Sequence, residues 1–127
     1  MILLVASCMS TETDIPEGEK YLPSEKLQLE YPEESETISL GLDTLSFKWV
    51  ELDAENIGKI TYTLNIEIKG LYDIELYSGE NTQVVVALDS LPLGYHYWYV
   101  KAEGSNVPKT YCTSDKRRIC FKNEFKP

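Results

Sequence analysis

The chain has 127 residues, which suits one domain, because domains typically contain about 100–150 residues. Its formal net charge of −9 argues against nucleic acid as a partner, since such binding depends on basic residues that neutralise phosphates. Hydrophobic residues make up 43% of the chain, and nine Tyr and two Trp are more aromatic residues than a disordered protein would carry. Length and composition together predict a single folded domain.

The first ten residues, MILLVASCMS, place a short apolar run and small residues directly before a cysteine, as at the end of a cleaved secretory signal. The segment Val5-Ala6-Ser7-Cys8 resembles the bacterial lipobox, and this resemblance implies cleavage before Cys8 and diacylation of its sulfur. Residues 1–7 would then be a signal remnant, and the lipid on Cys8 would hold the protein at a membrane. The alternative is that this run forms a first strand and Cys8 is a buried thiol.

The next segment is strongly acidic. Residues 10–36 contain nine acidic residues against two lysines, which accounts for −7 of the total charge. Repulsion between like charges, together with several prolines, predicts that residues 8–25 form an extended tether. An acidic segment after a lipidated cysteine also resembles the export signals of surface-exposed lipoproteins of Bacteroidota, and a solvated linker is the alternative.

From residue 26 onward, apolar and polar residues alternate in short runs separated by turn residues, which is typical of half-buried antiparallel strands. The clearest run is the segment from Ile60 to Ile68, in which every second residue is apolar. About seven such runs occur at the spacing expected of a β-sandwich over residues 26–127. They lie at residues 27–31, 45–49, 60–68, 72–76, 84–88, 95–102 and 119–121.

Three of these segments, TLSFKW (44–49), ITYTLNIEI (60–68) and LDSLPLGYHYWYVKA (88–102), resemble the fibronectin type III and related immunoglobulin-like pattern. The first two are also similar to the amino-terminal spacer domain of SusE- and SusF-type outer-membrane lipoproteins of Bacteroidota. The resemblance implies an all-β, fibronectin type III-like antiparallel sandwich and a setting in polysaccharide uptake at the outer membrane. It leaves two candidates, His96 and Tyr97, for the tyrosine-corner position of this fold.

Neighbouring residues of a strand point to opposite faces, so residues 95–102 divide into two sets. Trp98, Val100 and Ala102 form an apolar set that we expect in the core. The other set contains Tyr95, Tyr97 and Tyr99, and we expect it on an outer face. Flat rings there could stack on sugar rings or anchor a protein partner. The alternative is a structural role, because tyrosine commonly covers half-exposed sheet faces.

The sequence offers no convincing catalytic group, metal site or cofactor motif. The single histidine, His96, lies between tyrosines in a strand, where a structural imidazole is more plausible than a general base. Cys112 and Cys120 lack the close spacing and further ligands of a zinc site. Their positions around TSDKRRI favour a disulfide on an outer face of the last hairpin.

We therefore predict a non-catalytic interaction or spacer module, anchored by lipid to the outer membrane and facing either the medium or the periplasm. Its expected partner is a protein, which an exposed sheet edge or the tyrosine face would contact. The alternative function is a carbohydrate-binding module that uses the tyrosines of the outer face.

Overall fold

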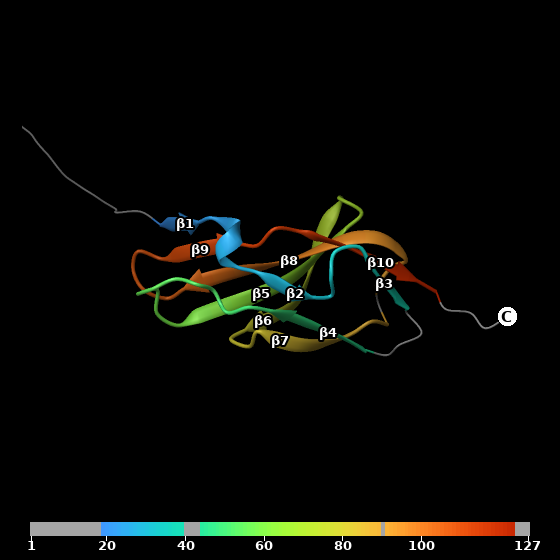
Figure 1. The fold of residues 1–127 in the computed structure, drawn as a ribbon, viewed down its shortest axis with the longest axis horizontal. Coiled ribbons are helices and arrows are strands. Elements are labelled where there is room, and N and C mark those ends of the chain that lie inside the picture. The colour runs from blue at the N-terminus through green and yellow to red at the C-terminus, as the bar shows by residue number, and fades with distance from the viewer. Residues whose placement is uncertain (1–18, 40–43, 90, 124–127) are drawn as a thin grey trace, which may run out of the picture.

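The computed structural model describes residues 19–39, 44–89 and 91–123, which fold into two β-sheets with a shared core (Figure 1). In chain order the elements are β1 (Lys20–Leu22), a 3-10 helix η1 (Ser24–Lys26), β2 (Leu29–Tyr31), β3 (Glu36–Ser39), β4 (Thr44–Trp49), β5 (Ile60–Ile68), β6 (Tyr72–Gly79), β7 (Gln83–Ala87), β8 (Gly94–Gly104), β9 (Thr110–Thr113) and β10 (Arg117–Lys122).

The larger sheet is built around β8, the longest strand. One side of β8 pairs with β5, which in turn pairs with β6, all antiparallel. The other side pairs with β10 along its first half and with β9 along its second half. Two short strands then add in parallel, β1 to β9 and β3 to β10. The smaller sheet has the order β2-β4-β7 and is antiparallel.

The core lies between the two sheets and is filled by the inward residues of each strand. Trp98 of β8 packs edge-on against Phe47 of β4, with ring centroids 5.1 Å apart, and both side chains are fully buried. Val100 and Ala102 are buried beside Trp98 on the same face of β8. The predicted core set of this strand is therefore confirmed, because burial follows the alternation of the strand.

The strands at the beginning of the described chain differ from the prediction. Residues Lys20–Leu22 form β1 in the larger sheet, although they fall within the segment predicted to be tether. Three residues are too few to show the alternation of apolar and polar side chains that identifies a strand. β1 forms because its backbone pairs with β9. β3 and β9, each of four residues, were also not among the predicted strands. The predicted signal remnant, Cys8 and the first part of the tether lie outside the described residues.

Candidate binding face

The predicted outer set of β8 lies on the outer surface of the larger sheet, but its three tyrosines are not equally accessible. Tyr95 and Tyr97 are 58% and 38% exposed, whereas Tyr99 is only 4% exposed. The prediction that the three tyrosines face outward is thus correct, but the prediction that Tyr99 is accessible to a partner is wrong. The candidate binding face is therefore reduced to Tyr95, Tyr97 and the groups around them.

Tyr99 is covered by side chains from other elements. Its hydroxyl donates a hydrogen bond of 2.9 Å to Oδ2 of Asp73 on β6. The ammonium of Lys116 lies 5.3 Å from the ring centroid and also pairs with Glu67 on β5, at 3.1 Å. Burial, reinforced by the hydrogen bond to Asp73, raises the pKa of Tyr99 to about 12. This tyrosine holds β8 to its neighbours and does not serve as a free contact.

This environment predicts a specific alkaline response. The folded state favours the neutral phenol of Tyr99, so its contribution to stability is complete below pH 10 and is lost as the pH rises towards 12. Tyr99→Phe should therefore cost about 1 kcal/mol at neutral pH, through the lost hydrogen bond, and this difference from wild type should shrink between pH 10 and 12. Urea unfolding at several pH values measures it. Tyr95→Phe, at an exposed position, is the control and should follow the wild-type curve.

The exposed tyrosines lie next to a guanidinium group. Arg118 of β10 places its guanidinium carbon 5.1 Å from the centroid of the Tyr95 ring. Its Nε and Nη2 both lie 3.3 Å from Oγ of Ser35, which holds the side chain in this position. The backbone register sets Arg118 directly opposite Tyr97. The result is an exposed surface of two rings and a guanidinium, a combination that is frequent at the centres of protein interfaces.

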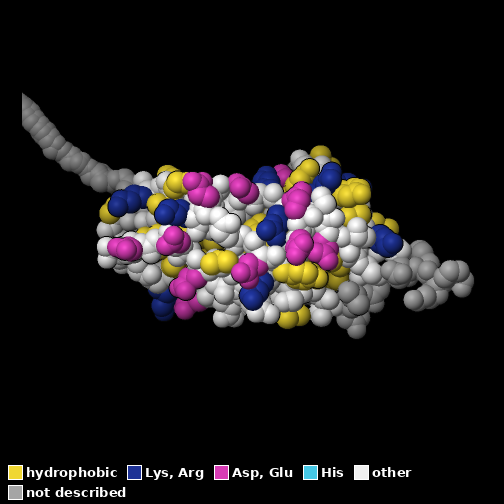
Figure 2. Space-filling view, in the orientation of Figure 1, with side chains coloured by type: hydrophobic (Ala, Val, Ile, Leu, Met, Phe, Trp, Pro, Cys, Tyr) yellow, Lys and Arg dark blue, Asp and Glu magenta, His cyan; other side chains and the backbone are white. Residues whose placement is uncertain are grey.

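Further apolar side chains lie at the same end of the larger sheet. The hairpin between β5 and β6 turns at Lys69 and Gly70, and both residues have a positive φ. Gly70 adopts this conformation without strain because it has no side chain. Leu71 and Tyr72 follow the turn and are exposed. Hydrophobic side chains gather around this projecting hairpin in Figure 2, whereas acidic and basic side chains are mixed along the strands.

His96 is fully buried on the inner side of β8 and has a structural role. Its Nδ1 accepts a hydrogen bond from the backbone N–H of Lys69 (3.2 Å). Its Nε2 lies 3.0 Å from the carbonyl oxygen of Pro92, which can only accept, so Nε2 is the donor of this hydrogen bond. A side chain near the start of this strand that bonds to the backbone a few residues upstream is the tyrosine-corner arrangement. His96, and not Tyr97, occupies that position, and its predicted structural role is confirmed.

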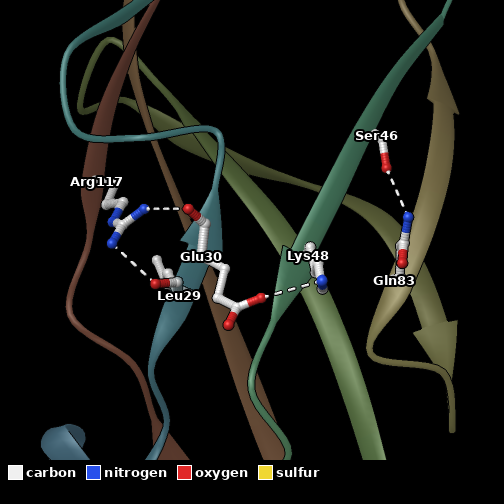
Figure 3. A network of polar contacts seen from close by, with 6 residues as sticks. All are labelled: Leu29, Glu30, Ser46, Lys48, Gln83 and Arg117. Atoms are coloured by element: carbon white, nitrogen blue, oxygen red, sulfur yellow. Dashed lines mark hydrogen bonds and ion pairs between the residues drawn. The ribbon is translucent and has the colours of Figure 1, made fainter.

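A residue that the sequence analysis missed joins the two sheets. Arg117 of β10 reaches β2 in the smaller sheet, as Figure 3 shows. Its Nη2 donates to the carbonyl of Leu29 at 2.8 Å, and its Nη1 donates to the carbonyls of Glu30 and Pro32, both at 3.0 Å. One signal was present in the sequence. Arg117 shares the phase of the buried residues Ile119 and Phe121, and a charged residue at an inward position requires partners.

The predicted disulfide between Cys112 and Cys120 is wrong, and both cysteines are free. Cys112 lies opposite Ala102 and Cys120 lies opposite Tyr95, so the two cysteines are separated by seven residues along β8. At about 3.3 Å per residue this separation is about 23 Å, whereas a disulfide needs Cα atoms within about 7 Å. β9 and β10 pair with the same side of β8 at its two ends, and they are not the arms of a hairpin. Burial raises the pKa of the Cys112 thiol.

Two hollows in the described part of the surface lie away from Tyr95 and Tyr97. One, of about 450 Å³, is lined by Glu51, Lys59 and Glu80 among others, and a second of similar size lies beside β1 and Pro108. Both are near the end of the sandwich where β8 finishes. Within the described ranges, no cluster of three His, Cys, Asp or Glu side chains could hold a metal ion. Among these same residues, no helix is long and apolar enough to cross a membrane.

Comparison with solved structures finds a fibronectin type III domain, from the human KIAA0970 protein, with a similar fold. The TM-score is 0.52 and the sequence identity is 16%, and the alignment covers 82% of this chain and 78% of that chain. No model of a protein family and no curated protein matches the sequence. At this identity the likeness concerns the fold, and it confirms the predicted fold class: the chain is an all-β sandwich of the fibronectin type III kind.

Proposed function

We propose that this chain is a non-catalytic interaction and spacer module, anchored to the bacterial outer membrane through a lipid on Cys8, and that it meets a protein partner with the surface around Tyr95, Tyr97 and Arg118. A setting in polysaccharide uptake is part of the proposal and rests on the resemblance of the TLSFKW and ITYTLNIEI segments to lipoprotein spacer domains.

The observation that carries this proposal is the separation of the two ends of the domain. The described chain begins next to β1, and β1 pairs with β9 beside Gly104, the last residue of β8. Tyr95 is at the opposite end of β8, nine residues away, which corresponds to about 30 Å. A domain held at its amino terminus would thus present the exposed tyrosines away from the membrane, where a partner can reach them.

The anchor is tested by cell fractionation. Wild type should sediment with membranes, and Cys8→Ala should appear in the soluble fraction, because a diacylated cysteine provides two lipid chains and a single signal gives only marginal binding. Cys120→Ala is the matched control, because it removes a thiol from the surface of the sandwich and should leave the protein on membranes. Membrane retention of Cys8→Ala would refute the anchor.

The binding surface is tested by a photo-crosslinking residue placed at Tyr97 in intact cells. We expect a defined protein adduct that weakens when Tyr95→Ala is added, since hot-spot residues act together with their neighbours. The same probe at Thr61, an exposed outward position near the other end of the larger sheet, is the control and should give no such adduct. Equal adducts from both positions would contradict a specific surface.

The exposure of Tyr95 and Tyr97 on an open sheet face also favours a second function, carbohydrate binding, because sugar rings stack on such side chains. The purified protein should then be retarded in glycan affinity gels, and Tyr95→Ala or Tyr97→Ala should abolish the retardation. Tyr21→Ala is the control, since Tyr21 is an exposed tyrosine on β1. This function fails if no glycan retards the wild-type protein.

A further inference from the structure

Strands at the edge of a sheet have unpaired backbone groups on one side, so they can pair with a strand of another molecule. In the described part of the chain, the edge strands are β1, β2, β3, β6 and β7. Proteins usually protect such edges with charges, proline, irregular pairing or short length. The five edges can therefore be compared by the protection that each one carries.

Four of the edges are protected. β6 carries Asp73 and Glu75, and its register with β5 is irregular at Leu64 and Asn65. β2 has three residues, contains Glu30, precedes Pro32 and shifts its register against β4. β1 and β3 have three and four residues, and each contains a charged side chain.

β7 has none of these features. Its sequence, Gln-Val-Val-Val-Ala, is free of charge, proline and glycine, and it pairs with β4 in an unbroken register over all five residues. Val85 is 67% exposed on the outer face, next to Ser46 of β4. A regular, uncharged edge of β-branched residues is a template for strand addition, and β7 runs along the margin of the molecule in Figure 1.

We propose that β7 pairs antiparallel with β7 of a second copy of this chain, so that two three-stranded sheets join into one sheet of six strands. A twofold axis through Val85 places Val85 opposite Val85, Val84 opposite Val86, and Gln83 opposite Ala87. Valine pairs across antiparallel strands are favourable, and no charged side chain of β7 meets another in this register.

The charge of the molecule restricts where a second copy can pair, because like-charged surfaces repel each other. The net charge of −9 makes two copies repel each other over most of their surface, and the acidic edge of β6 would oppose self-pairing directly. β7 is uncharged, so the repulsion is weakest there. Five residues on each side make a small interface, and the dimer is consequently weak and reversible. This pairing does not depend on the proposed function.

Sedimentation equilibrium of the full 127-residue chain, purified without lipid, tests the dimer. Wild type should change from monomer to dimer between low micromolar and several hundred micromolar concentrations. Val85→Lys should weaken dimerisation at least about tenfold, since it places two like charges opposite each other. Leu71→Lys adds the same charge at an exposed position of the β5–β6 turn and should dimerise like wild type. A monomeric wild type, or an unchanged dimer in Val85→Lys, overturns the proposal.

The register is tested by a disulfide, which also covers the case in which Val85→Lys fails to fold. In a background of Cys8→Ser and Cys120→Ser, Val85→Cys should form a disulfide-linked dimer under mild oxidation, because the twofold register brings the two Cα atoms within the reach of a disulfide. Ser46→Cys, one strand further from the axis, is too distant and should remain monomeric. Equal crosslinking at both positions, or none at position 85, overturns the proposed register.

Discussion

Arg117→Met should lower the free energy of unfolding by about 2–3 kcal/mol, because a hydrogen bond from a charged group is worth about 1.5–3 kcal/mol and the three bonds share one half-buried guanidinium. The guanidinium of Arg117 serves three carbonyls of β2 and its following loop, so the substitution leaves these acceptors without their protein donor. Methionine keeps the apolar stem, which limits the effect to the hydrogen bonds. Denaturant unfolding can be followed by tryptophan fluorescence, since Trp49 and Trp98 are 1% and 0% exposed.

The neighbouring arginine provides the control for this prediction. Arg118→Met removes the same charge from the same strand, but the side chain of Arg118 lies on the outer surface and contacts the hydroxyl of Ser35 and the ring of Tyr95. We expect a loss below about 1 kcal/mol, as for other exposed polar contacts. Arg117→Lys should lie between wild type and Arg117→Met, because one ammonium cannot reproduce the forked geometry. Equal losses from Arg117→Met and Arg118→Met would show that the link between the sheets is not the cause.

The part of the fold that sequence predicts well is the part where burial repeats with the strand period. In β5, Leu64, Ile66 and Ile68 are apolar at every second position, and all three are buried. The same rule placed Trp98 in the core of β8. Most side chains that face the core are apolar, so the strand period of burial can be recognised directly in the local sequence.

The features that sequence could not predict depend on contacts between distant segments. Tyr99 has the outward phase of Tyr95, and its burial depends on contacts with Asp73 and Lys116, which come from other parts of the chain. The strands β1 and β3 form by backbone pairing at an existing edge, which side-chain patterns do not record. The disulfide prediction failed for the same reason, because spacing in the chain does not show that β9 and β10 pair with opposite ends of β8.

A second large loss of stability is expected from His96→Phe, at about 2–3 kcal/mol. Phenylalanine keeps a ring of similar size beside Phe121 and removes both hydrogen bonds of the imidazole. The backbone N–H of Lys69 and the carbonyl of Pro92 then lose their partners, and an unpaired buried polar group costs about 1–3 kcal/mol. Because Lys69 follows β5 and Pro92 precedes β8, the substitution should also loosen the end of the sandwich that carries Tyr95.

His96→Gln separates the hydrogen bonds from the ring. Glutamine offers a donor and an acceptor for the two backbone groups that the imidazole contacts, so it should recover part of the stability that His96→Phe loses. Tyr97→Phe, at the adjacent exposed position, should change the free energy of unfolding by less than about 0.5 kcal/mol. If His96→Phe unfolds at the same denaturant concentration as Tyr97→Phe, the histidine contributes packing only. If His96→Gln is no more stable than His96→Phe, the two hydrogen bonds are not the source of the loss. The expected order, from most to least stable, is Tyr97→Phe, His96→Gln and His96→Phe, because only the last removes both backbone partners from a buried site.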